Sequence, residues 1–189
     1  MDTVATMRQV VDETTKIVDG IKPDQLGNPT PCTEWSVRDL LNHITGGATM
    51  FAVAAEEGSC PDELLGQLMT GDNLGDDYRG AWKTASQRAV AAFDLPGVLD
   101  TVVKLPFGEM PGGVALSIAV FDVTTHATDL CKATGQPAPP PELLETALGV
   151  GKQMIGPDLR MPGLFDAEQP VADSAPIGDR LLAFAGRKV

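Results

Sequence analysis

Two side chains able to do chemistry lie four residues apart in the second half of the chain. Asp122 and His126 belong to the segment 119–135, which we predict to be the second half of a long apolar helix that ends at Gly135. Four residues make about one turn of an α-helix, so the carboxylate and the imidazole share a face. Apolar residues continue that face, which indicates that it points toward a core.

A carboxylate on a buried face needs a partner, because burying an unpaired charge is costly. A metal ion is one such partner, and Asp-x-x-x-His is a spacing at which a helix can hold a metal. An ordinary pair between helical neighbours is the simpler alternative. The chain has only two histidines, His43 and His126, so their positions carry unusual weight.

Composition and charge narrow the class of protein. With 189 residues the chain is expected to form one domain, residues 1–189, with a sizeable core. The net charge of -12 repels phosphate backbones and anionic lipids, so we expect neither nucleic acid nor a membrane as partner. The sequence shows no run of 18 apolar residues and no signal segment, and we therefore expect a cytoplasmic protein.

Helical periodicity dominates the rest of the chain. Together with the helix that carries Asp122, it predicts an all-α bundle with extra short helices and a small β excursion. The excursion is a β-branched stretch at 99–105 followed by a turn-rich link at 106–113 that is able to fold back as a hairpin. The other predicted helices span 4–18, 36 to about 55, 61–69, 77–94, 142–155 and 177–184.

The second helix carries His43 beside its apolar stripe. Ser36 is a suitable N-cap for this helix, and Asp39, three residues later, completes a capping box. Asp39 also lies one turn before His43, where its carboxylate would be able to bond and orient the imidazole. Both roles remain open for Asp39.

Several segments together resemble one known family. Thr30-Pro-Cys-Thr-Glu-Trp-Ser-Val-Arg-Asp-Leu-Leu-Asn-His43 resembles the opening motif of DinB-like metal-binding proteins, in the branch grouped with mycothiol-dependent maleylpyruvate isomerase. Leu105-Pro-Phe-Gly-Glu-Met-Pro-Gly, the stretch from His126 to Gln136 and the ending Asp179–Arg187 are similar to that branch as well. The likeness covers nearly the whole chain.

The resemblance implies a four-helix bundle that holds a divalent metal, typically zinc, with Ni²⁺ and Fe²⁺ as alternatives. It assigns the ligand positions to His43, Asp122 and His126. Two imidazoles and one carboxylate leave a coordination position for water or substrate, as in catalytic zinc sites. Asp129 is expected either to orient His126 or to replace Asp122 as the ligand.

In this family the implied reactant is a low-molecular-weight thiol, here of the mycothiol type. The resemblance therefore implies a metal-dependent thiol S-transferase or isomerase-like enzyme that acts on a small electrophile, with catalytic residues other than the metal ligands unassigned. A non-catalytic protein that binds metal or a small ligand is the alternative, and a homodimerisation module with a vestigial site is a third. The chain departs from the family in having Asp122 where glutamate is common.

The remaining candidates have structural explanations. Three cysteines, an odd number without a Cys-x-x-Cys pair, favour reduced thiols over a disulfide framework. Cys131 lies five residues from His126 and hence on another face of the helix, so we expect a buried thiol and not a nucleophile. Trp35 and Trp82 are expected in the core or, for Trp35, in a hydrophobic staple with Leu40.

Overall fold

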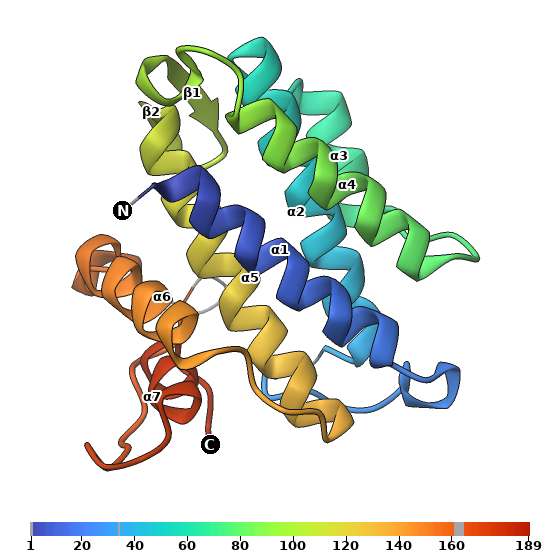
Figure 1. The fold of residues 1–189 in the computed structure, drawn as a ribbon, viewed down its shortest axis with the longest axis vertical. Coiled ribbons are helices and arrows are strands. Elements are labelled where there is room, and N and C mark those ends of the chain that lie inside the picture. Colours follow the sequence, from blue (N-terminus) through green and yellow to red (C-terminus); the bar gives the residue numbers. More distant parts are fainter. Residues whose placement is uncertain (1, 34, 161–164) are drawn as a thin grey trace. The chain divides into compact units, whose positions relative to one another are not determined.

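A computed structural model describes residues 2–33, 35–160 and 165–189 (Figure 1). Glu34 of the Thr30–His43 motif and residues 161–164, which lie between two predicted helices, are outside the described part. The chain divides into two compact units. Unit 1 comprises Met1–Asp19 and Leu41–Val120, and unit 2 comprises Gly20–Leu40 and Phe121–Val189. The single domain expected over residues 1–189 stays a prediction.

The described residues are mostly helical, which confirms the all-α prediction. The helices are α1 (Thr3–Gly20), α2 (Val37–Glu57), α3 (Asp62–Thr70), α4 (Tyr78–Phe93), α5 (Gly112–Thr134), α6 (Pro141–Met154) and α7 (Ile177–Phe184). Short 3₁₀ turns lie at Pro23–Gln25, Val98–Asp100 and Pro157–Leu159. Strands β1 (Val102–Leu105) and β2 (Gly108–Pro111) form an antiparallel hairpin, so the small β excursion is confirmed.

Unit 1 is a helical core around Trp82. This side chain on α4 is fully buried, as expected, and its indole N–H donates to the hydroxyl of Thr15 on α1 at 3.1 Å. On its outer side, α4 is joined to α2 by an ion pair between Arg88 and Glu56 at 2.6 Å. Apolar burial and these two polar contacts hold the three helices together.

Within unit 1, the hairpin is joined to the end of α2 through its backbone. The Lys104 amide of β1 donates to the Gly58 carbonyl just after α2, at 2.7 Å. The predicted strand at 99–105 begins only at Val102, because Val98–Asp100 forms a 3₁₀ turn instead. Gly108 turns the hairpin with a φ of 133°, a conformation that glycine adopts without strain.

The start of α2 matches its predicted capping box. The Asp39 amide donates to the Ser36 hydroxyl at 3.2 Å, and the Ser36 amide donates back to the Asp39 carboxylate at 3.0 Å. The hydrogen bonds from Ser36 lower the pKa of Asp39 below its usual value. The capping role of Asp39 is therefore confirmed, and its role beside His43 stays a prediction.

Unit 2 packs α6 and α7, orange and red in Figure 1, with the second half of α5. Their shared apolar cluster is buried, and its members include Phe121, Leu144, Ala147, Leu148, Leu181 and Phe184. On the rim, Lys132 of α5 pairs with Asp179 of α7 at 2.6 Å. The carboxyl-terminal helix is thus fixed to α5 by packing and by charge.

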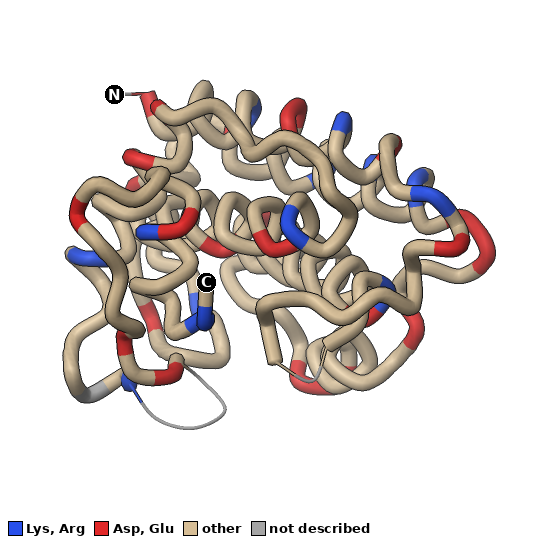
Figure 2. Tube along the Cα trace, turned by 90° about the horizontal axis from the view of Figure 1, so that it is seen from below, with Lys and Arg blue, Asp and Glu red and all other residues tan. Residues whose placement is uncertain are grey.

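The acidic residues behind the net charge of -12 are not confined to one segment of the chain. Acidic residues are spread over both units (Figure 2). Among the described residues, α5 is the one helix long and apolar enough to cross a membrane by those criteria, but 78% of its apolar window is buried within the protein. Burial of this kind is typical of a core helix.

Two glycines of α6 give a matched test of the packing in unit 2. A Cβ on Gly151 would lie 2.6 Å from Phe121 and 2.8 Å from Phe184, whereas a Cβ on Gly149 would meet nothing within 4 Å. We expect Gly151→Ala to lower the free energy of unfolding by about 1–3 kcal/mol through overpacking. Gly149→Ala should raise it by up to about 1 kcal/mol, because alanine favours the helix. Urea denaturation of both variants checks this, and equal effects would contradict the packing described here.

Candidate metal centre

Asp122 and His126 face one another on α5. The Nε2 atom of His126 lies 3.5 Å from Oδ1 of Asp122. The imidazole is buried, while the Asp122 side chain keeps 29% of its surface exposed. The pair therefore has one end in the protein interior and one end that small molecules can reach.

The other ring nitrogen of His126 meets Asp129. Nδ1 lies 3.2 Å from Oδ2 of Asp129, a carboxylate with no exposed surface. Oδ2 also accepts hydrogen bonds from Nε and Nη2 of Arg187, at 3.3 and 3.2 Å. Oδ2 of Asp129 is placed to accept a hydrogen bond from Nδ1, and the tautomer of His126 with its hydrogen on Nδ1 presents the lone pair of Nε2 toward Asp122. Of the two predicted roles for Asp129, orienting His126 is the one that this geometry supports.

Burial and charge act in opposite directions on His126. Burial of the ring lowers the pKa of this imidazole, but the neighbouring carboxylates of Asp122 and Asp129 outweigh it, and the pKa is raised above its usual value. The site thus attracts a cation, whether a proton or a metal ion.

The distance between Nε2 and Oδ1 is long for a direct hydrogen bond and is also compatible with a metal ion between the two atoms. Hydrogen bonds from N–H to oxygen are commonly 2.7–3.2 Å long. A tetrahedral zinc ion bound at about 2.0–2.1 Å by both atoms would hold them about 3.3 Å apart. The observed 3.5 Å is close to that separation.

Arg187 already contacts a second set of side chains that could bind a metal. Cys32, His126 and Asp129 offer ligand atoms within 4.8 Å of one another. The Nη2 atom of Arg187, however, lies 3.5 Å from the Cys32 sulfur and 3.5 Å from Nδ1 of His126. The guanidinium therefore lies against the atoms through which this second set would bind a metal.

The loop before α2 surrounds the imidazole. It docks on the carboxyl end of α5, where the Asn28 side chain donates to the Ala133 carbonyl and the Gln25 side chain donates to the Thr134 carbonyl, both at 3.1 Å. The Thr30 hydroxyl closes the following turn by donating to the Trp35 carbonyl at 2.9 Å. This turn carries Trp35, which lies against the His126 ring, and Cys32, which contacts Arg187.

Trp35 is a wall of the site and not a core residue. Its ring is half-buried, with its centroid 6.0 Å from that of the His126 ring. The predicted staple with Leu40 stays a prediction. Sequence reasoning missed the contact with His126, because 91 positions separate the two residues in the chain.

Arg187 contacts His126 and Asp129 and was not singled out from the sequence, and the end of α7 positions it. After α7 the Arg187 amide donates to the Leu182 carbonyl and the Gly186 amide donates to the Ala183 carbonyl. Together with the positive φ of 92° at Gly186, these bonds form a Schellman motif. The glycine followed by arginine at the end of a predicted helix was the available signal.

His43 lies on α2 within unit 1 and is half-buried. It follows Trp35 by eight residues, with the start of the helix between them. Its predicted role as the remaining ligand is taken up under the proposed function.

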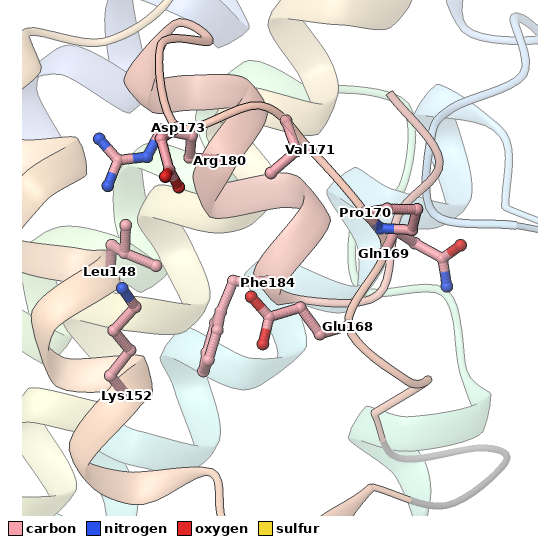
Figure 3. A pocket seen from close by; sticks show the side chains of 9 residues that line it. All are labelled: Leu148, Lys152, Glu168, Gln169, Pro170, Val171, Asp173, Arg180 and Phe184. Atoms are coloured by element: carbon pink, nitrogen blue, oxygen red, sulfur yellow. The ribbon is translucent and has the colours of Figure 1, made fainter.

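A separate hollow of unit 2 is lined by residues of α6, of α7 and of the segment 168–173. It has a volume of about 490 Å³ and is lined by Leu148 and Phe184 together with charged side chains. Figure 3 shows Lys152 of α6, Glu168 and Arg180 around it. None of the residues predicted to bind a metal lines this hollow.

Comparison with known proteins identifies the family of the chain. Residues 7–131 match the family model described as the mycothiol maleylpyruvate isomerase N-terminal domain. The chain belongs to this family. The resemblance stated from the sequence is thereby confirmed.

Two curated relatives and two solved structures are similar to this chain. The uncharacterized proteins MT0763 and Rv0738, from two strains of Mycobacterium tuberculosis, are each 35% identical over the full length of both chains. Crystal structures of the mycothiol-dependent maleylpyruvate isomerase, one of them a histidine-to-alanine mutant, share the fold at TM-scores of 0.59 and 0.62. They are 17% identical, and the match covers 77% of this chain and 66% of theirs. This family member thus spans about two thirds of the isomerase chain and has the expected DinB-like fold.

Cys131 is not equipped to serve as a nucleophile in this family member. Its side chain is buried, its thiol donates to the Pro137 carbonyl at 3.0 Å, and burial raises its pKa to about 12. The expected buried thiol is confirmed.

Thiol labelling tests this assignment. With a pKa of about 12, only about one Cys131 thiol in ten thousand is ionised at pH 8, and the thiolate is the reactive form. We expect iodoacetamide at pH 8 to label the more accessible Cys60 in the folded protein and to leave Cys131 unmodified until unfolding, as followed by mass spectrometry. Labelling of Cys131 at the rate of Cys60 would show that the thiol is open to solvent.

Proposed function

We propose that the protein is a divalent-metal-dependent enzyme, with zinc as its metal, that uses a small thiol of the mycothiol type. It transfers this thiol to a small electrophile or isomerises the electrophile with the thiol's help. The single observation that carries the proposal is the Nε2–Oδ1 separation of 3.5 Å between His126 and Asp122, in a member of a mycothiol isomerase family.

His43, Asp122 and His126 are the proposed ligands. The Asp122–His126 spacing supports two of them directly. For His43 the support is indirect: Trp35, just before α2, lies against the His126 ring, and His43 follows on the second turn of that helix. Two imidazoles and one carboxylate form an open zinc site, and they also suit Fe²⁺ or Ni²⁺.

The residues around the ligands have distinct tasks. A divalent ion bound there supplies the Lewis acidity that lowers the pKa of a thiol or a water. Asp129 holds the proton on Nδ1 of His126, so that the lone pair of Nε2 is directed away from the interior. Trp35 covers the ring and limits the access of water. In a transfer, the thiol loses its proton to solvent and its sulfur forms a bond to an electrophilic carbon. The bond between that carbon and its leaving group breaks, and the electron pair departs with the leaving group.

Metal content tests the ligand set. Protein purified without a metal-affinity step should contain about one equivalent of zinc by elemental analysis, and His126→Ala, His43→Ala and Asp122→Asn should each lose most of it. Asp173→Asn, which changes a carboxylate in the separate hollow, is the control and should retain the metal. Wild-type protein that stays metal-free after incubation with zinc would exclude the proposed centre.

Turnover tests the reaction. We expect mycothiol-dependent consumption of a small electrophile such as maleylpyruvate, and His43→Ala should reduce kcat/KM by at least about 100-fold with its helicity unchanged by circular dichroism. Full metal occupancy without any thiol-dependent turnover would instead support the non-catalytic binding protein. A homodimer and a cytoplasmic location remain predictions.

A further inference from the structure

We propose that Arg187 is a positioning residue for the metal centre, acting on His126 through Asp129. This inference deepens the proposed function and rests on it for its metal-binding part. The guanidinium holds the buried carboxylate of Asp129 in the position from which Oδ2 faces Nδ1, and thereby sets which nitrogen of His126 faces Asp122.

The first support is the charge balance inside unit 2. Asp129 has no exposed surface, and a buried carboxylate is strongly destabilising unless it is paired. Among the described residues, its hydrogen bonds come from His126 and Arg187 and all reach Oδ2, whereas Oδ1 has no partner. Without Arg187, the imidazole would be the one described donor left to this carboxylate.

The second support is that Arg187 is itself held in place. Its side chain is only 11% exposed, and Nη1 donates to the Ala185 carbonyl at 2.7 Å. The Schellman motif at Gly186 fixes the backbone from which the side chain extends. The planar guanidinium of Arg187 donates from two nitrogens to the same oxygen of Asp129, so it is already ordered before any metal binds.

A purely structural clip between α7 and α5 is the competing explanation. The chain offers a control for it, since Lys132 and Asp179 also join α5 to α7, at 2.6 Å, without contacting His126. Lys132→Ala removes a connection between these two helices and leaves the Asp129–His126 contact in place. A structural role predicts similar effects for both variants, and a positioning role predicts different ones.

The test uses two readouts on wild type, Arg187→Ala, Arg187→Lys and Lys132→Ala. The first is zinc affinity, measured by competition with a chelator. Losing a partner that orients a metal-bound histidine commonly weakens metal binding 10–100-fold. We expect a loss of about that size in Arg187→Ala, a smaller loss in Arg187→Lys, which keeps the charge but not the planar fork, and no change in Lys132→Ala.

The second readout needs no metal. With only two histidines in the chain, the Nδ1–H resonance of His126 can be assigned by ¹⁵N NMR in the metal-free protein. We expect slow exchange of this proton with solvent in wild type and in Lys132→Ala, and fast exchange in Arg187→Ala.

The outcomes separate the two proposals. If the wild type binds no zinc but Arg187→Ala still loses the protected Nδ1–H proton, the metal function fails and the positioning of His126 stands. If Arg187→Ala retains the proton, or if Lys132→Ala loses it equally, the positioning role is wrong. Should Arg187→Ala not fold, Arg187→Lys carries the same comparison, and unchanged affinity together with unchanged exchange in that variant would overturn the proposal.

Discussion

The buried carboxylate of Asp129 is the constraint around which unit 2 is assembled. A charge with no exposed surface must meet positive or hydrogen-bonding groups, and the residues next to it on α5 supply only the imidazole of His126. The guanidinium therefore comes from beyond α7, which requires α7 to pack on α5 and to end in a tight turn. The apolar cluster around Phe121 and Phe184 makes this packing favourable independently of the charge.

Much of the fold was predictable because its signals are local. The limits of α5 and α7 follow from helical periodicity and from residues that stop helices, and the structure has α7 at Ile177–Phe184, as predicted. The capping box of Ser36 and Asp39 spans only three residues, so it is also readable from the sequence. The Asp122–His126 spacing belongs to the same class, since helix geometry alone brings the two side chains together.

The rest of the site depends on contacts between residues far apart in the chain, for which periodicity has no signal. Arg187 lies 58 positions from Asp129, and Trp35 lies 91 positions from His126. Burial of Asp129 was implied by its apolar helix face, but its choice of partner was not, because any cation that the fold brings near would serve. Asp39 shows that a local pattern can also be ambiguous. One carboxylate satisfied both a capping pattern and an orienting pattern, and only coordinates show the hydrogen bonds that it makes.

The two nitrogens of His126 have different partners, one in the buried core and one at the partly exposed end of the site. Nδ1 belongs to a buried network that unit 2 needs in order to satisfy Asp129, whereas Nε2 faces the partly exposed Asp122. Because the ring is rigid, fixing one nitrogen fixes the direction of the other. A metal at Nε2 would therefore meet a ligand whose orientation the fold already determines, so that little ordering is left to the binding step. The same coupling makes the site sensitive to changes near α7, even though no residue of that helix is a proposed ligand.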